Sequence, residues 1–272
     1  MTKACVVRTN GLMMVVALAL TVPVGCGGPG RGVGQGPLAL ARQYIAKEQY
    51  QPAVQVLSTF IAKPSGANEV GTAHYLRGLA YAQMEPARNK LAQEDFEQAL
   101  AKAHKKKELA AFAHVGLGHL YFESRPDEQE RAVEHYEAAL SQIDADEETQ
   151  AVVLYRQGVA LQRLGRWEEA DRYLSQTFDR FGESTYGGYA REHFGSRAWR
   201  LQFGAFAVRE RAVKLVEQLK RDGTQADWAP RRREGGVLYT VQAGRYGTYR
   251  QARQALAAVH GAYRQTQIVA AP

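Results

Sequence analysis

Between residues 38 and 184 the apolar side chains recur with the period of an amphipathic helix, in a pattern that repeats along the chain. Gly78, Gly118 and Gly158 lie 40 residues apart, each on the first helix of a predicted pair. The second helices have apolar or small residues at i, i+4 and i+7, namely Ala53, Leu57 and Phe60, Ala92, Phe96 and Ala99, Ala132, Tyr136 and Ala139, and Ala170, Leu174 and Thr177. Because one helical hairpin cannot bury its own apolar face, we predict an all-α array of stacked hairpins.

The last part of the chain has a different pattern, which occurs twice at an offset of 40 residues. The segments AWRLQFGAF and GVLYTVQAGRY alternate apolar and polar residues, as half-buried strands do. Each is followed by a helical run with one apolar face and then by a second candidate strand, TQADWAP or TQIVAA. A segment of about 40 residues buries too little surface to be stable alone. The two halves are therefore predicted to form one small α/β domain with the ferredoxin-like order βαββαβ.

Alternation assigns the side chains of the two long strands to two faces of the sheet. Leu201 and Phe203 are predicted to face the helices in one strand, and Tyr239 and Val241 in the other. The residues predicted on the helix-free face are Arg200, Gln202, Leu238, Thr240 and Gln242. This row offers amide and guanidinium groups, which suit hydroxyls and N-acetyl carbonyls. The glycine two residues after each glutamine is predicted to let the chain leave the strand tightly.

The N-terminus has the pattern of an export signal. Lys3 and Arg8 precede an apolar run of 13 residues, Leu12 to Val24, which is too short to span a bilayer as a helix. Six of the ten residues before Pro37 are glycines, so this stretch is predicted to be a flexible tether.

Charge is unevenly spread along the chain, whose formal net charge is +7. Residues 37–196 hold 18 basic and 23 acidic side chains, whereas residues 197–272 hold 14 basic and 5 acidic ones. The basic C-terminal part favours a polyanionic or carboxylate-bearing partner, and a merely soluble, arginine-rich surface is the alternative. The two cysteines, Cys5 and Cys26, lie outside the predicted folded body, which argues against a disulfide framework and a cysteine metal site.

The helical region resembles the tetratricopeptide (TPR) family, and the best single unit is Tyr155–Phe178. Its repeat of 40 residues departs from the usual period of about 34. We place the extra residues in the inter-helix turns that contain Pro86 and Pro126. The resemblance implies a groove that binds an envelope protein, and a rigid spacer without a dedicated partner is the alternative.

Residues 197–272 resemble the SPOR (sporulation-related repeat) domain through LQFGAF, RERAVKLVEQLKRDG, LYTVQAGRY and RQARQALAAV. The resemblance implies binding of peptidoglycan, especially glycan strands stripped of stem peptides, on the helix-free sheet face. The family's outward glutamine falls on Gln202, and its small residue between glycine and the aromatic falls on Ala205. Leu238 and Thr240 stand where the family often has an aromatic residue and an arginine. The candidates to compensate for these two departures are Arg200, Gln242 and the predicted loop of Arg231, Arg232 and Arg233.

The stretch VPVGC resembles a bacterial lipoprotein processing signal, which implies that Cys26 is lipidated and becomes the mature N-terminus. Pro23 departs from the branched aliphatic residue that is usual three positions before the cysteine, and ordinary signal cleavage is the alternative. Gly27 stands where many inner-membrane lipoproteins have an acidic residue, so the resemblance favours the outer membrane, facing the periplasm.

Three other function classes are weighed against this interpretation. RNA binding on a βαββαβ sheet needs exposed aromatic residues, and alternation turns Phe203 inward. For an enzyme we find no nucleophile elbow, phosphate loop or metal-ligand spacing, and His74 and His114 occupy one repeat position where a packing residue is expected. A scaffold that acts only through TPR contacts, with the C-terminal domain as a cap, stays open.

We therefore expect a multidomain chain of class α plus α/β, without catalytic, metal or cofactor sites. The predicted segments are a signal peptide (1–25), a lipidated cysteine and tether (26–37), a TPR-like domain (38–184), a connector (185–196) and a SPOR-like domain (197–272). The expected function is that of an envelope lipoprotein of cell division or wall remodelling, which docks on peptidoglycan, recruits a protein partner, is anchored in a membrane by its lipid and binds no nucleic acid.

Overall fold

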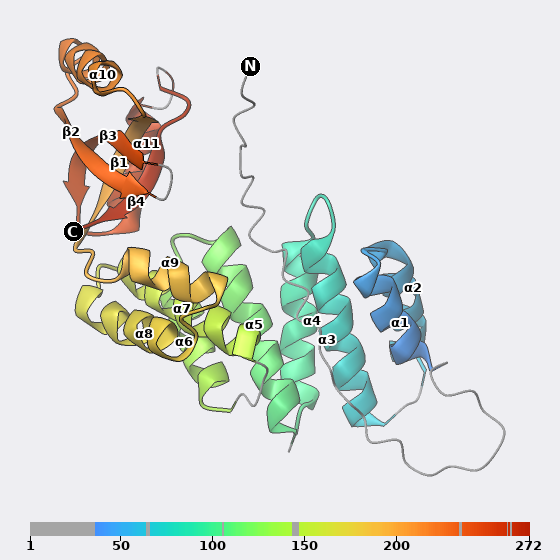
Figure 1. Ribbon diagram of the computed structural model, residues 1–272. Helices are drawn as coiled ribbons and strands as arrows, with labels where there is room; N and C mark the ends of the chain where they lie inside the picture. Colours follow the sequence, from blue (N-terminus) through green and yellow to red (C-terminus); the bar gives the residue numbers. More distant parts are fainter. Residues whose placement is uncertain are drawn as a thin grey trace. The chain divides into compact units, whose positions relative to one another are not determined.

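The computed structural model describes residues 36–63, 66–104, 106–142, 147–233, 236–259, 261 and 263–272 (Figure 1). The helices of these residues are α1 (Pro37–Ala46), α2 (Tyr50–Ile61), α3 (Ala67–Gln83), α4 (Asn89–Lys102), α5 (Lys107–Ser124), α6 (Gln129–Leu140), α7 (Glu147–Arg163), α8 (Trp167–Arg180), α9 (Thr185–His193), α10 (Arg209–Arg221) and α11 (Tyr249–Val259). The strands are β1 (Ala198–Phe206), β2 (Ala226–Arg233), β3 (Gly236–Tyr246) and β4 (Gln267–Ala271). The helical region followed by a small sheet with its own helices is the predicted fold class.

The described residues form two compact units. Among the described residues, the first unit contains those from 36 to 125 and from 134 to 150, and the second contains those from 126 to 133 and from 151 to 272. Helices α1 to α8 follow one another as the predicted pairs, as a helical repeat array requires. The assignment to the TPR family and the predicted domain boundaries stay predictions.

The repeated glycines of the first helices mark close helix–helix contacts. A Cβ atom added at Gly78 of α3 would come within 2.9 Å of the Phe96 ring of α4. One at Gly118 of α5 would come within 2.7 Å of the Tyr136 ring of α6. Such distances are shorter than real Cβ contacts, so a larger residue would force the helices apart. The repeat of small residues in the sequence is thus explained by the large residue opposite each one.

The prolines of the two predicted turns lie between helices. Pro86 follows the end of α3 at Gln83, and Pro126 follows the end of α5 at Ser124. Proline lacks the N–H that would continue a helix, so both helices end before the prolines, as the sequence indicated.

A buried ionic cluster joins α2, α3 and α4 in the first unit. Asp95 accepts hydrogen bonds from Arg77 Nε at 2.7 Å and Arg77 Nη2 at 2.8 Å, and its Oδ1 lies 2.7 Å from His74 Nδ1. Arg77 Nη1 also donates to the hydroxyl of Ser58 at 3.0 Å. Burial opposes ionisation of Asp95, but the hydrogen bonds from Arg77 and His74 outweigh it and lower the pKa of the carboxyl group.

His114, the other histidine at this repeat position, also packs between helices. Its Nδ1 lies 3.0 Å from Nδ1 of His135, and burial lowers the pKa of His114. Both histidines therefore lie at contacts between helices, but each also has a polar partner, Asp95 for His74 and His135 for His114.

In the second unit the four strands form one antiparallel sheet with the order β2-β3-β1-β4. This is the ferredoxin-like arrangement that the internal repeat predicted. Helices α10 and α11 lie on one face and bury their apolar sides against Leu201, Phe203 and Val241. These three residues were predicted to point inward, and alternation along the strands explains why they do.

The predicted connector contains helix α9. Ser184 caps α9, because its hydroxyl oxygen accepts a hydrogen bond from the backbone N–H of Gly187 at 3.0 Å. The helix ends at His193, and Gly195 follows in a left-handed conformation with φ 73°. Helix α9 packs on α8 and leads directly into β1.

Trp199 ties the start of β1 to the preceding helices of the second unit. The indole Nε1 donates to the backbone oxygen of Gln162 in α7 at 2.9 Å. Its ring centroid lies 5.8 Å from that of Trp167 in α8 and 5.1 Å from that of Tyr249 in α11. The sheet and helices α7 to α9 therefore share buried contacts.

Candidate functional site

The strand register places the predicted site residues on the sheet face opposite α10 and α11. Gln202 of β1 stands opposite Gln242 of β3, and Ala205 stands opposite Thr240. Simple alternation would put Ala205 and Gln202 on different faces. The pairing shifts by one residue between Gln202 and Gly204, and such a bulge returns Ala205 to the face of Thr240. Leu238 lies on this face as well, opposite Arg231 of β2.

The prediction that the chain leaves each strand at its glycine is wrong. Strand β1 continues past Gly204 to Phe206, and β3 continues past Gly244 to Tyr246. A Cβ at Gly204 would come within 2.7 Å of the Phe206 ring. Gly244 has φ 71°, a left-handed conformation that favours glycine. Both glycines therefore make room for the aromatic residue that follows, inside the strand.

Arg200 braces the sheet face. Its Nε donates to the backbone oxygen of Gly244 at 2.9 Å, and its Nη2 lies 2.7 Å from Oδ2 of Asp227 in β2. The guanidinium thus reaches across β3 to β2. It was predicted as a compensating ligand group, but its Nε and Nη2 are bonded within the sheet.

Two glutamine amides form the centre of this face. Gln242 Nε2 donates to Gln202 Oε1 at 3.3 Å. Gln242 is only 6 % exposed, whereas Gln202 is half-buried. The pair leaves the N–H groups of Gln202 and the Oε1 of Gln242 to bond a ligand. Thr240, also 6 % exposed, donates its hydroxyl to the backbone oxygen of Ala229 at 3.2 Å.

The predicted arginine loop is part of a strand. Arg231, Arg232 and Arg233 end β2 and pair with Leu238, Val237 and Gly236 of β3. Three successive arginines show no alternation, so the sequence pattern did not reveal the strand. Arg231 is half-buried beside Leu238, Arg232 is exposed, and the side chain of Arg233 lies outside the described part of the structure.

These residues line a cavity of about 660 Å³, here called the sheet-face cavity. Seven of the predicted residues contribute to its wall, namely Gln202, Ala205, Arg231, Arg232, Leu238, Thr240 and Gln242. The sequence analysis missed the part contributed by β4 and α9, which includes Gln267, Glu192 and His193. Alternation along TQIVAA could have identified Gln267, because it pairs with Gln202, but no local pattern connects α9 to the sheet.

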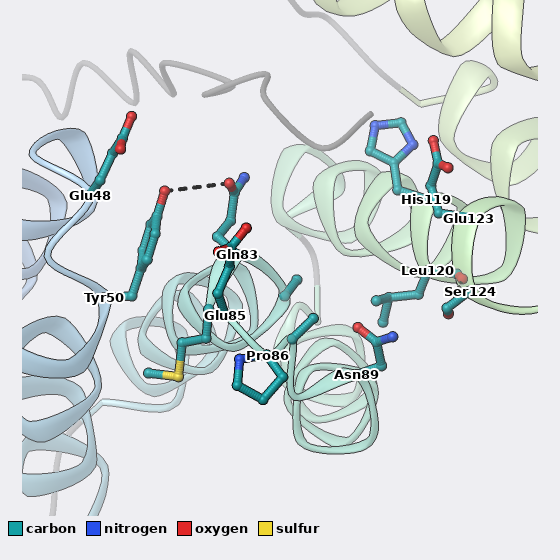
Figure 2. Close-up of a pocket in the computed structure, with 13 residues that line it drawn as sticks. Glu48, Tyr50, Gln83, Glu85, Pro86, Asn89, His119, Leu120, Glu123 and Ser124 are labelled. Carbon is teal, nitrogen blue, oxygen red and sulfur yellow. Dashed lines mark hydrogen bonds between the residues drawn. The ribbon is translucent and has the colours of Figure 1, made fainter. Parts of the chain in front are cut away.

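Figure 2 shows a second cavity, of about 670 Å³, among the helices of the first unit. Its wall carries the carboxylates of Glu48, Glu85 and Glu123. Tyr50, whose hydroxyl donates to Oε1 of Gln83 at 3.4 Å, stands on one side, and Glu123 stands across the opening. The cavity is acidic, in contrast to the arginine-bearing sheet face.

Several predictions concern parts of the chain that lie outside the described residues. These are Cys26, the signal peptide and the glycine-rich tether up to residue 35. Within the described residues, no helix is both long and apolar enough to cross a membrane. The same residues contain no group of three or more His, Cys, Asp or Glu side chains that could hold a metal ion.

Comparison with known families explains the sheet. Residues 195–270 match the family model of the SPOR domain, and no curated protein matches the chain. The match contains β1, α10, β2, β3, α11, β4 up to residue 270 and the predicted site residues of the sheet. A SPOR domain is a binding module, and its presence implies peptidoglycan binding, an association with the cell envelope and a connection to cell division. Residues 195–270 of this protein are a SPOR domain.

Proposed function

We propose that this protein is a non-catalytic component of the cell envelope that holds glycan strands of peptidoglycan in the sheet-face cavity. The observation that carries the proposal is the pair of amides, Gln202 and Gln242, in a cavity on the helix-free face of a SPOR domain. An amide presents N–H donors and a carbonyl acceptor together. The hydroxyl and N-acetyl groups of a glycan strand need both kinds of partner.

The two departures from the family's usual residues change how a sugar is held. Leu238 is half-buried on the cavity wall and offers apolar surface without an aromatic ring. The hydroxyl of Thr240 is already bonded to Ala229, so it donates nothing further. Gln202 and Gln242 therefore supply the main directional contacts of the proposed site.

The positive end of the cavity gives a reason to prefer stripped glycans. An amidase that removes stem peptides hydrolyses the amide on the lactyl group and leaves a carboxylate on each muramic acid. Arg231 and Arg232 line the cavity and provide cations to pair with it. Within residues 197–272, basic side chains outnumber acidic ones, and this positive charge attracts the same polyanionic strand at longer range.

Replacing Gln202 by Ala tests the site. The substitution removes the N–H donors of Gln202, and a net hydrogen bond contributes about 1 kcal/mol, so binding is expected to weaken roughly fivefold. The measurement is co-sedimentation of the full chain, kept in detergent, with purified sacculi. Sacculi pretreated with an amidase are expected to bind more protein than intact ones.

Gln254→Ala is the matched control, because Gln254 is an exposed glutamine of α11 on the other side of the same domain. It should bind sacculi like the parent chain. Sacculus binding that is unchanged by Gln202→Ala would contradict the sheet-face site. Failure of the parent chain to bind either kind of sacculus would favour the alternative function, an envelope scaffold that acts through its helical region.

The helical region is proposed to recruit a protein partner. The cavity of Figure 2, with the carboxylates of Glu48, Glu85 and Glu123 around it, supports a partner segment that carries Lys or Arg. Such a segment would find opposite charge there, whereas an acidic one would be repelled.

The lipid anchor completes the proposal. Cys26 at the end of the signal sequence is proposed to carry acyl chains, with attachment to the outer membrane on its periplasmic side. Replacing Cys26 by Ser is expected to move the chain from the detergent-extracted membrane fraction to the soluble periplasmic fraction. Quantitative immunoblotting of the two fractions measures this, with Cys5→Ser as the control. Equal membrane retention of both variants would contradict lipidation at Cys26.

A further inference from the structure

The wall of the sheet-face cavity extends beyond the SPOR domain. Glu192 and His193 end α9 and line the cavity, yet they precede residue 195, where the family match begins. On the sheet side, the cavity also reaches Trp199 of β1 and Ala270 of β4. The preceding helix therefore contributes chemistry that the SPOR domain alone lacks.

The imidazole of His193 is held in one orientation. Its Nδ1 lies 2.8 Å from Oε1 of Gln162, and Gln162 Nε2 donates to the backbone oxygen of His193 at 2.9 Å. Gln162 is fully buried, and its own backbone oxygen accepts from Trp199. The rings of Tyr155 and Trp199 stand edge-on to the imidazole, with centroid-to-centroid distances of 5.7 and 6.5 Å. This packing positions the ring before any ligand arrives.

The same contact assigns the protons of the ring. Oε1 of a glutamine only accepts hydrogen bonds, so Nδ1 of His193 carries the hydrogen and donates it. In a neutral imidazole the other nitrogen, Nε2, then has a lone pair and accepts. Among the described residues, no protein group forms a hydrogen bond with this Nε2.

Burial keeps the ring neutral. It lowers the pKa of His193 to about 4, although the carboxylate of Glu192 acts in the opposite direction, and Arg163 adds to the lowering. At neutral pH the imidazole is thus an acceptor and not a cation. The part of the cavity wall formed by His193 and Glu192 therefore differs in charge from the part formed by Arg231 and Arg232, because it carries no cation.

We propose that His193 is a ligand-binding residue of the sheet-face cavity, where its Nε2 accepts a hydrogen bond from a hydroxyl or an N-acetyl N–H of the glycan strand. The proposal rests on the proposed glycan binding and adds a contact from outside the SPOR domain. It also orients the strand, because sugar carboxylates are drawn to the arginines and neutral donor groups to the imidazole.

His193→Asn isolates the acceptor. An asparagine amide can keep an N–H close to the position of Nδ1 and thus the bond to Gln162, but it has no group at the position of Nε2. Amidase-treated sacculi are expected to bind the full-length variant roughly fivefold more weakly than the parent chain, while the hydrogen-exchange protection of β1 and α7 peptides stays close to the parent's. His104→Asn is the matched control, because His104 is an exposed histidine of the first unit.

A second measurement on the parent chain does not depend on a variant. A tetrasaccharide of alternating N-acetylglucosamine and peptide-free N-acetylmuramic acid is added to the full chain labelled with ¹⁵N-histidine. The Nε2 resonance that is missing from His193→Asn is expected to shift, while that of His104 stays. A residue with only a structural role would show no such shift.

The outcomes separate the two proposals. If His193→Asn binds like the parent, the Nε2 resonance is unmoved and Gln202→Ala still weakens binding, then the role of His193 is overturned and glycan binding on the sheet stands. If the parent chain binds neither sacculi nor the tetrasaccharide, the proposed function fails and the role of His193 fails with it.

Discussion

Replacing Trp199 by Ala is expected to lower the free energy of unfolding of the second unit by about 4 kcal/mol. The indole is 3 % exposed and packs between Trp167 of α8 and Tyr249 of α11. Its removal leaves a cavity where helices α7 and α8 meet the sheet. It also removes the indole hydrogen bond to the backbone oxygen of Gln162, which then accepts only from the backbone N–H of Gly165 at 3.0 Å.

Hydrogen exchange of the full chain, read by mass spectrometry on peptides from β1 and α7, measures this effect. A chain with two compact units need not unfold in one step, so a local readout is required. Trp228→Ala is the control, because that indole is half-buried on the sheet. Its removal should lower the free energy of unfolding by about 2 kcal/mol. A smaller loss for Trp199→Ala than for Trp228→Ala would show that the contacts of Trp199 with α7 and α8 do not stabilise the unit.

Asp95→Ala is expected to destabilise the first unit by about 3 kcal/mol. Asp95 is 3 % exposed and pairs with Arg77 and His74. Its removal leaves the guanidinium of Arg77 without its carboxylate partner in a largely buried site. Arg77 keeps about a fifth of its side chain exposed, and water reduces the cost accordingly. Exchange protection of α3 and α4 peptides reads out the loss.

The acid dependence of the same protection gives a second check. The pKa of Asp95 lies below its ordinary value of 3.8, so its contribution is present above that pH and is lost as the pH falls through the folded-state pKa. The parent chain should therefore lose this increment of stability in acid, and Asp95→Ala should not. Glu97→Ala, which removes an exposed carboxylate of the same helix, should leave both the stability and its acid dependence nearly unchanged.

Where the sequence is periodic, its pattern was enough to predict the elements and their buried faces. The segment AWRLQFGAF is β1 from its first to its last residue, and Leu201, Phe203 and Val241 form the core that alternation assigned to them. Gly78 and Gly118 lie against Phe96 and Tyr136, as the small and large residues of the helical repeat indicated. These features depend on contacts whose partners recur at a regular spacing along the chain, so a pattern records them.

Where the alternation of apolar and polar residues is interrupted, the predicted limits of the strands were wrong. Arg231 and its two neighbours have no alternation of polarity, and pairing with β3 made them a strand. Gly204 was expected to end β1, but the strand continues. A glycine stands at this position because a larger residue would collide with the Phe206 ring. Hydrogen bonding between strands and the volume of a neighbouring ring outweigh local propensity in both cases.

The composition of the site was decided by the tertiary structure. The sequence predicted Gln202 and Gln242 on the helix-free face, but only the folded structure shows that they bond each other and that a bulge turns Ala205 toward them. Arg200 changed from a free ligand group to a brace because Asp227 lies within its reach. His193 joined the cavity because Gln162, 31 residues earlier, holds its ring. A one-dimensional pattern determines which way a side chain points within its own element, whereas which groups meet depends on packing between elements that are distant in sequence.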